Sequence, residues 1–216
     1  MKEYVTIGKE ETIVEIVIEK SRFIACAKQV DSVEEAAAFV AEKRKKYFDA
    51  THNCYAWIVG EKAKFSDDGE PSGTAGKPIL NGTAGMPMYE CIKQNSFDRL
   101  CVVVTRYFGG IKLGAGGLVR AYSGATASVL KLCTRLKFVD CIRAEVVLDY
   151  SLLPPVKRAL TGLCVIENII YGDKVTVLCL FPHDLYDTIS NIVCQTTLAK
   201  ANLKQIERFL CPYQAD

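Results

Sequence analysis

The sequence lacks the short motifs of the commonest nucleotide-binding loops. No G-x-x-x-x-G-K-[ST] motif occurs in its 216 residues, and the nearest approach to G-x-G-x-x-G has Val119 where the last glycine is required. Histidine is scarce, with two residues, and the ten cysteines include no C-x-x-C pair. Nucleotide binding through either motif is therefore disfavoured, and the scattered cysteines indicate reduced, mostly buried thiols rather than disulfides.

Long apolar runs are also missing. No window approaches the 18 apolar residues of a membrane span, and the N-terminus MKEYVTIGKEE carries charge where a signal peptide needs an apolar run. These absences predict a cytoplasmic protein without a membrane segment. Half of the residues are apolar, which is enough for one large core or two modest ones, and typical domain sizes favour two.

Glycine is concentrated in two runs. Eleven of the fifteen glycines lie between Gly69 and Gly124, mainly in Asp67 to Pro78 and in Thr105 to Gly124. Because glycine permits positive φ and close backbone approach, we expect these loops to face a ligand or to pack very tightly.

Apolar patterning predicts a first domain over residues 1–137. Alternation on both sides of Lys20 to Arg22 indicates two strands joined by a turn. Ser32-x-x-Glu35 is a capping box before a helix that ends in Lys43 to Lys46. Further strands are expected at 54–59 and 100–105, a short helix near 89–94 and a longer helix at about 116–133.

After Lys137 the pattern changes to the order β-α-β-β-α-β, which predicts a ferredoxin-like domain over residues 138–216. Pro154-Pro155 suit the first turn of a helix, where their missing N–H groups need no partner. Without a glycine loop or an acidic cluster, this domain is expected to dock a partner or to dimerise. Its strands are expected at 144–150, 165–171, 174–181 and 204–210, with a second helix at 184–194.

The second glycine run is the main candidate site. A strand leads into Gly109-Gly110, and Gly114 and Gly116-Gly117 stand at the entry to a helix. Free N–H groups and the dipole at such a helix start favour an anion, so the run predicts a bound phosphate group. The alternative is that these glycines only let the helix pack on the sheet. Three cations accompany the run: Arg106, Lys112 and Arg120.

Two further groups each allow a functional and a structural interpretation. The turn from Asp67 to Glu70 has three carboxylates that could hold magnesium or orient a water, but Asp and Gly also dominate ordinary solvated turns. His52 and Cys54 would face the same side of a strand as a nucleophile and its base. Neighbours two residues apart rarely aim their reactive atoms at each other, which favours a buried histidine.

Positive charge is concentrated in an otherwise balanced chain of net charge +2. The stretch from Arg99 to Val139 has seven Lys or Arg and no Asp or Glu, and Lys43 to Lys46 add four more cations. Tyr107, Phe108 and Tyr122 are interleaved with this charge, as in surfaces whose aromatic rings stack on unpaired bases. The alternative is a solvated basic face.

These residues resemble a known family. The runs SDDGEPSGTAGKPIL (Ser66 to Leu80) and VVVTRYFGGIKLGAGGLVRAY (Val102 to Tyr122), with HNCYAW upstream, closely resemble the signature of the YigZ/IMPACT family, and the bacterial YigZ branch is similar over essentially the whole chain. The resemblance implies an α+β protein of two domains. The first would have the left-handed β-α-β fold of a ribosomal protein domain, with helices packed on a mixed sheet, and the second would be ferredoxin-like, similar to domain five of elongation factor G.

The resemblance also implies a cytosolic, nucleic-acid- or ribosome-associated regulator of translation. Eukaryotic IMPACT proteins have an additional N-terminal domain that engages the activator of a starvation-sensing kinase. This chain is expected to start almost directly at its first strand, so that role is not transferred.

Residues and resemblance together favour a binding protein over an enzyme, with RNA or the ribosome as partner, no cofactor and no metal. A protein partner for the second domain and an oligomer stay open. The alternatives are a metal-dependent phosphotransferase or hydrolase that uses the Asp67 to Glu70 turn, and a protein-protein adaptor. The predicted phosphate-binding residues are Arg106, Tyr107, Gly109, Gly110, Lys112, Gly114, Gly116, Gly117 and Arg120, and the rest of the candidate surface is His52, Asn53, Asp67, Asp68, Glu70, Ser72 and Thr74.

Overall fold

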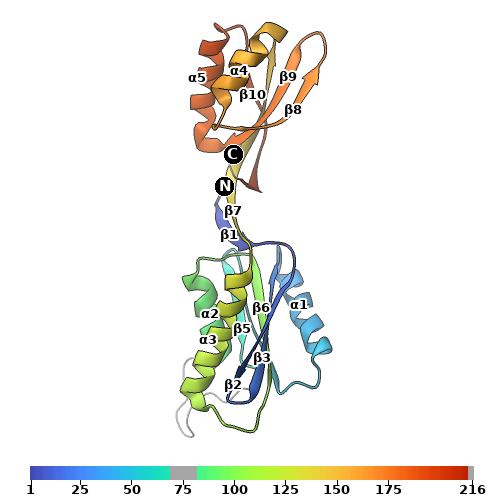
Figure 1. Cartoon of the computed structure of the whole chain (residues 1–216), viewed down its shortest axis with the longest axis vertical. Helices are drawn as coiled ribbons and strands as arrows, with labels where there is room; N and C mark the ends of the chain where they lie inside the picture. The colour runs from blue at the N-terminus through green and yellow to red at the C-terminus, as the bar shows by residue number, and fades with distance from the viewer. Residues whose placement is uncertain (69–81, 214–216) are drawn as a thin grey trace. The chain divides into compact units, whose positions relative to one another are not determined.

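The computed structural model describes residues 1–68 and 82–213 and divides the chain into two compact units. One unit is residues 5–136. The other is residues 137–216 together with Met1–Tyr4, so the first four residues group with the C-terminal part and not with the N-terminal domain expected from the sequence. Each unit is described here by itself (Figure 1).

The 5–136 unit is built on a five-stranded sheet whose central strand, β6 (Leu100–Tyr107), is buried along almost its whole length. Its continuous apolar run suits a strand that is covered on both faces. All neighbouring pairs in the order β2-β3-β6-β4-β5 are antiparallel, whereas the sequence analysis expected a mixed sheet. The other strands are β2 (Thr12–Ile18), β3 (Ser21–Gln29), β4 (His52–Val59) and β5 (Lys62–Ser66).

A β-α-β unit lies within this antiparallel sheet. Strands β3 and β4 both run antiparallel to β6, which separates them, so they are parallel to each other. Helix α1 (Val33–Lys46) connects them. The capping box is confirmed, because Ser32 Oγ accepts a hydrogen bond from the Glu35 amide at 3.1 Å, while the Glu35 carboxylate accepts one from the Asp31 amide at 2.8 Å.

Helices cover both faces of the sheet (Figure 1). Helices α2 (Gly85–Gln94) and α3 (Gly114–Leu132) pack on one face, and α1 packs on the other. Tyr122 of α3 is fully buried and meets the ring of Phe23 edge to face, with 5.4 Å between centroids. The interpretation of Tyr122 as a base-stacking residue is therefore wrong, because its ring is part of the core.

The second unit has an antiparallel sheet in the order β10-β7-β9-β8, with β1 (Tyr4–Ile7) also beside β7. Numbered from β7 onward, this is the strand order 4-1-3-2 that the β-α-β-β-α-β sequence pattern expects of a ferredoxin-like domain. The strands are β7 (Arg135–Leu148), β8 (Val165–Tyr171), β9 (Val175–Pro182) and β10 (Leu203–Pro212).

Two helices complete this unit, α4 (Leu153–Leu160) and α5 (Tyr186–Thr196). Short 3₁₀ turns, Tyr150–Leu152 and His183–Leu185, precede them. Prolines stand in the first turn of α4 as predicted, and both helices contribute to a single core with the sheet. The α+β class and the ferredoxin-like arrangement are therefore confirmed.

No helix in the described ranges is long and apolar enough to cross a membrane. All ten cysteines are free thiols, and most of them are buried, as their scatter predicted. Burial raises the pKa of the Cys26 thiol to about 12, which keeps it protonated and unreactive near neutral pH.

Candidate functional site

The Asp67 carboxylate caps helix α2. Its Oδ1 accepts hydrogen bonds from the backbone amides of Ala84 at 3.0 Å and Gly85 at 2.6 Å. No side chain at the N-cap position Ala84 does this, so an acid from 17 residues earlier satisfies the first amides of the helix and complements its dipole. A Cβ at Gly85 would lie 2.7 Å from the Ser66 amide nitrogen, so the end of β5 packs directly on the helix start.

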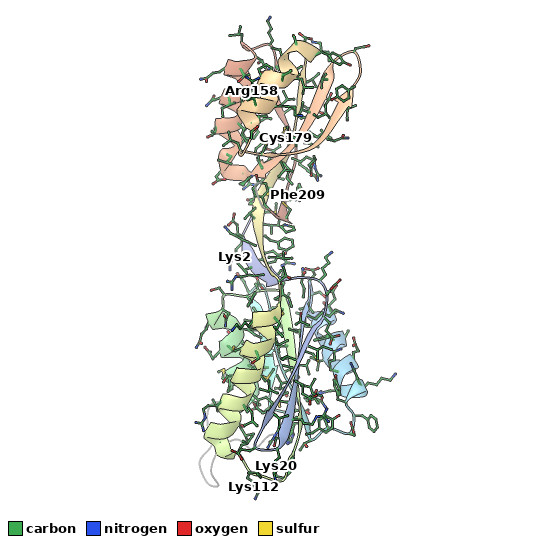
Figure 2. All side chains as sticks on the ribbon, viewed as in Figure 1. Lys2, Lys20, Lys112, Arg158, Cys179 and Phe209 are labelled. Carbon is green, nitrogen blue, oxygen red and sulfur yellow. The ribbon has the colours of Figure 1, made fainter. Side chains whose placement is uncertain are left out.

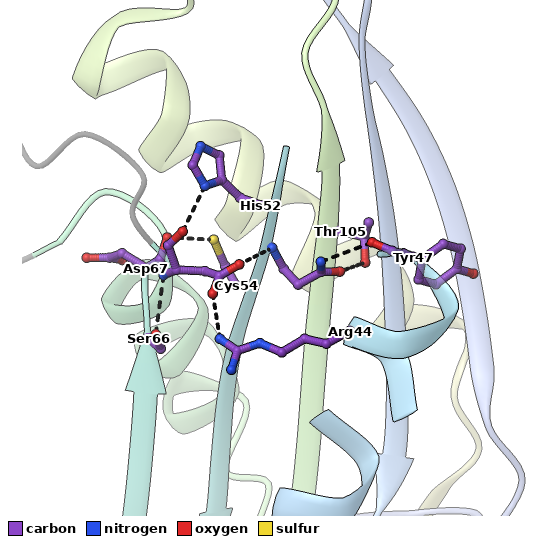
Figure 3. Close-up of polar contacts among 9 residues, drawn as sticks. Arg44, Tyr47, His52, Cys54, Ser66, Asp67 and Thr105 are labelled. Atoms are coloured by element: carbon purple, nitrogen blue, oxygen red, sulfur yellow. Dashed lines mark hydrogen bonds and ion pairs between the residues drawn. The ribbon is translucent and has the colours of Figure 1, made fainter. Parts of the chain in front are cut away.

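The next residue, Asp68, joins α1 to β4. Figure 3 shows the Arg44 side chain extending from α1 toward β4. Its carboxylate accepts the Asn53 amide at 2.7 Å and pairs with Arg44 Nη2 at 2.5 Å. The ring of His52 lies 2.8 Å, through Nδ1, from the Asp68 carbonyl oxygen. Because a carbonyl oxygen can only accept, Nδ1 donates in this hydrogen bond. We call this arrangement of Asp67, Asp68, His52, Asn53 and Arg44 the acidic clasp.

Asn53 and Cys54 are held inside the acidic clasp. The Asn53 side chain donates to the Tyr47 carbonyl at 3.3 Å and accepts from Thr105 Oγ1 at 2.8 Å. Cys54 is fully buried, and its thiol donates to the Asp67 carbonyl at 3.1 Å. These contacts give both side chains a structural role. Burial of the Cys54 thiol also disfavours the hypothesis that Cys54 is a nucleophile and His52 its base.

Helix α3 starts in the opposite way. Its N-cap residue, Leu113, supplies no side-chain hydrogen bond, and its first turn contains no acid. Gly114 has φ +67°, a backbone conformation that favours glycine. The first amides of α3 lack partners within the helix, and two exposed cations, Lys112 and Arg120, flank them.

The loop before α3 is held by one close backbone approach. A Cβ at Gly109 would overlap the backbone carbonyl of Lys20, and the Gly109 amide donates to Ser21 Oγ at 3.2 Å. Figure 2 places Lys20 and Lys112 at the same end of the unit. Among the described residues, a Cβ at Gly116 would meet only the Arg120 side chain, at 3.7 Å, and a Cβ at Gly124 would meet nothing within 4 Å. Packing therefore requires glycine at 109 but not at 116 or 124.

Two pockets meet at Arg120. One of about 410 Å³ lies between the β2–β3 turn and the start of α3, with Glu19, Lys112 and Gly117 in its lining. The other, about 720 Å³, lies between α2 and α3, with Gly82 and Gly124 in its lining. Asp67 and Asp68 line neither pocket. Gly82, which lines the larger pocket, packs closely against the Asp67 carboxylate, so among the described residues the acidic clasp approaches that pocket through Gly82 rather than through its own side chains.

Arg106 differs from the other two predicted phosphate-binding cations. It is 5% exposed, and its guanidinium lies 5.7 Å from the centroid of the Phe23 ring and 5.6 Å from that of Phe108. On β6 it pairs with His52 of β4, at the edge of the acidic clasp. Its guanidinium therefore lies against two aromatic rings, in cation-π geometry.

The side chain of Tyr107 is held in place by contacts with two neighbouring residues. Its hydroxyl donates to Asp49 Oδ1 at 2.8 Å, and the Arg22 guanidinium lies 5.2 Å from its ring centroid. Desolvation and the bond to Asp49 raise the pKa of Tyr107, which keeps the hydroxyl protonated.

The basic run at the end of α1 is only partly exposed. Lys43 is 1% exposed, and its Nζ lies 2.7 Å from carboxylate oxygens of both Glu11 and Glu42. Arg44 belongs to the acidic clasp. Lys45 and Lys46 are the two members of the run that face solvent without such an ion pair.

Three predicted residues, Glu70, Ser72 and Thr74, lie outside the described residues. Within residues 1–68 and 82–213, no group of three or more His, Cys, Asp or Glu side chains could hold a metal ion. Sequence reasoning missed Arg44 and Thr105 as partners of the acidic clasp. No local signal marks them, since they bind residues 24 and 52 positions away.

Comparison with known proteins identifies the family. A model of the Impact N-terminal domain matches residues 19–82 and 80–130, which include both the acidic clasp and the start of α3. YvyE of Bacillus subtilis, an IMPACT family member, is 36% identical over 199 residues, covering 89% of this chain and 87% of the relative. The chain belongs to the IMPACT family.

Other proteins are similar to this IMPACT protein in sequence or in structure. YigZ of Escherichia coli is 40% identical over 152 residues, covering 68% of this chain and 70% of YigZ. A solved structure described only as that of a hypothetical protein matches with a TM-score of 0.58 at 31% identity, covering 96% of this chain and 98% of the other. The two-domain translational regulator Yih1 matches with a TM-score of 0.37 at 27% identity, covering 58% of this chain and 48% of Yih1.

The capping role of Asp67 predicts a stability effect. Asp67→Ala should lower the free energy of unfolding by about 1–2 kcal/mol, because two amides at the start of α2 lose their acceptor. Asp67→Asn keeps an acceptor oxygen and should cost less. Urea unfolding followed by the fluorescence of Trp57, the only tryptophan, reports on this unit. Equal losses in the two variants would contradict a capping role.

The glycines of the IMPACT loop should separate into two classes. Gly109→Ala should destabilise the 5–136 unit by about 1–3 kcal/mol, because its Cβ overlaps the Lys20 backbone. Gly116→Ala should be neutral or stabilise by up to about 1 kcal/mol, because alanine favours the helix and has room. Both changes are measured by the same Trp57 unfolding curves. Equal destabilisation by the two would show that both glycines serve packing.

Proposed function

We propose that this IMPACT protein binds RNA, alone or within the ribosome, and regulates translation through that contact. The observation that carries the proposal is the start of α3, where the N-cap residue supplies no side-chain hydrogen bond and the first turn contains no acid. Two exposed cations, Lys112 and Arg120, line the adjoining pocket, and Glu19 lies across it. This is the chemistry that a phosphate group needs. The role in translation rests on membership of the IMPACT family and not on the geometry of this site.

Phosphate binding at this helix start has a clear physical basis. The first amides of α3 point out of the helix, and the dipole adds partial positive charge there. Lys112 and Arg120 supply full charges from the two sides. Gly116 carries no side chain at this point and is exposed, so a phosphate oxygen can approach the backbone there, whereas the Cβ position of Gly117 is already covered by Leu113.

The wider charge pattern supports a polyanion over a small anion. Within the acid-free stretch from Arg99 to Val139, Arg99 and Lys137 form ion pairs and Arg106 is buried. The exposed cations that the stretch still offers include Lys112, Arg120 and Lys131. RNA neutralises many cations at once, and its affinity grows with each counterion released. In this proposal the ferredoxin-like unit orients the RNA-binding unit or recruits a protein partner.

The enzymatic alternative is less well supported. A metal-dependent phosphotransferase would need the Asp67 and Asp68 carboxylates free for an ion, but both accept backbone amides, and Asp68 also pairs with Arg44. A protein-protein adaptor remains the second candidate, favoured by the groove of about 720 Å³ between α2 and α3. Co-sedimentation with ribosomes that survives nuclease and high salt would favour the adaptor.

Salt dependence tests the proposal. RNA affinity measured by filter binding should fall steeply from 50 to 200 mM salt. Lys112→Ala/Arg120→Ala should weaken binding and flatten the log-log salt slope by about 1.5, because two phosphate contacts are lost. Arg106 is not substituted in this test. Because it is buried, replacing it could destabilise the fold, and weaker RNA binding could then not be assigned to a lost phosphate contact.

A matched control separates fold from binding. Lys62→Ala/Lys131→Ala removes two exposed cations of the same unit, one at the start of β5 and one near the end of α3, and should leave the slope nearly unchanged. Gly116→Ala should fold normally and still bind RNA less tightly. Binding without salt dependence, or equal loss in both double variants, would contradict the proposal.

A further inference from the structure

Two exposed phenylalanines stand on neighbouring loops of the 5–136 unit. Phe48 follows α1 and is 84% exposed, and Phe108 follows β6 and is 47% exposed. Exposure of a phenyl ring to water is unfavourable, but single exposed apolar residues are common on protein surfaces and indicate nothing by themselves. Two rings on loops that are hydrogen-bonded to each other, beside surface cations, make a more specific arrangement.

The two loops form one braced platform. The Tyr107 hydroxyl donates to Asp49 Oδ1 at 2.8 Å, and the Phe108 amide donates to Thr51 Oγ1 at 3.0 Å. The Thr51 amide also donates to the Arg106 carbonyl at 2.9 Å. These bonds link the residues next to each ring, so little conformational entropy is lost when a ligand covers the rings.

Cations lie close to both rings in the sequence, and the Arg106 guanidinium lies 5.6 Å from the Phe108 ring centroid. Lys45 and Lys46 precede Phe48 and are exposed, and Lys46 Nζ lies 5.1 Å from the centroid of the Tyr47 ring. Lys112 follows Phe108 by four residues and leads to the start of α3. Rings that accept base faces, next to cations that accept phosphates, are the components of a single-strand binding surface.

We propose that an unpaired RNA strand crosses this end of the unit and stacks bases on Phe48 and Phe108 while its backbone reaches Lys45, Lys46 and Lys112. The proposal rests on the proposed function and narrows its ligand from RNA in general to unpaired nucleotides. A duplex hides the faces of its bases inside the helix, so it offers these rings nothing to stack on.

Fluorescence anisotropy with the full chain tests this inference. The probes are a labelled 12-nucleotide RNA of mixed sequence and the same strand annealed to its complement. The single strand should bind about tenfold more tightly than the duplex. Phe48→Leu keeps an apolar side chain without a π face and should weaken single-strand binding about tenfold, whereas Phe48→Trp should retain or strengthen it.

Leu198→Ala is the matched control, because Leu198 is 81% exposed but lies in the other unit. It should leave both affinities unchanged. A single-stranded DNA of the same sequence that binds equally would also support stacking, and would show that bases rather than ribose are recognised.

Three outcomes would overturn the inference. The first is equal affinity for single strand and duplex, with no effect of Phe48→Leu on binding. If the salt slope and the loss of affinity in Lys112→Ala/Arg120→Ala are still observed, this result rejects stacking and leaves the proposed function standing. Equal loss in Phe48→Leu and Phe48→Trp would mean that the ring only packs. No salt-dependent binding of either probe would reject both proposals together.

Discussion

The close contact between the Gly109 backbone and the Lys20–Ser21 turn is the constraint on which the rest of the candidate site depends. β3 and β6 are paired up to Arg22 and Tyr107, so the chain leaving β6 must pass the β2–β3 turn immediately. Only glycine fits there, and Ser21 Oγ holds its amide. This contact sets where the loop goes and therefore where α3 can start.

The two helices on that face of the sheet have opposite electrostatic arrangements at their starts. Asp67, which lies 17 residues before Ala84 in the sequence, places a negative charge on the first amides of α2. The first turn of α3 contains no acid, and Lys112 and Arg120 are exposed near it. A fold that only needed stable helices would gain from capping both. The N-cap residue of α3 supplies no such bond, and in the proposed complex a phosphate oxygen would be the missing acceptor.

Local rules predicted much of this structure. The Ser32 capping box, the prolines of α4 and the β-α-β-β-α-β order each depend on residues close in sequence, and all are confirmed. Long-range partners set the rest. β5 was missed because it is only five residues long and mostly exposed, so its short alternation of polar and apolar residues gives a weak signal. Lys43 was placed on the surface because Glu11, which binds it, lies 32 residues away. The role of Asp67 as a cap likewise depends on α2 folding back onto β5.

The central claim is that the start of α3 receives a phosphate of RNA. The most direct test is a titration of ¹⁵N-labelled protein with a 12-nucleotide single-stranded RNA, followed by amide chemical shifts. The account predicts the largest shifts at Gly114 to Gly117 and Lys112, with smaller ones at the acidic clasp. Shifts confined to the ferredoxin-like unit, or none at α3 while the RNA binds, would contradict it.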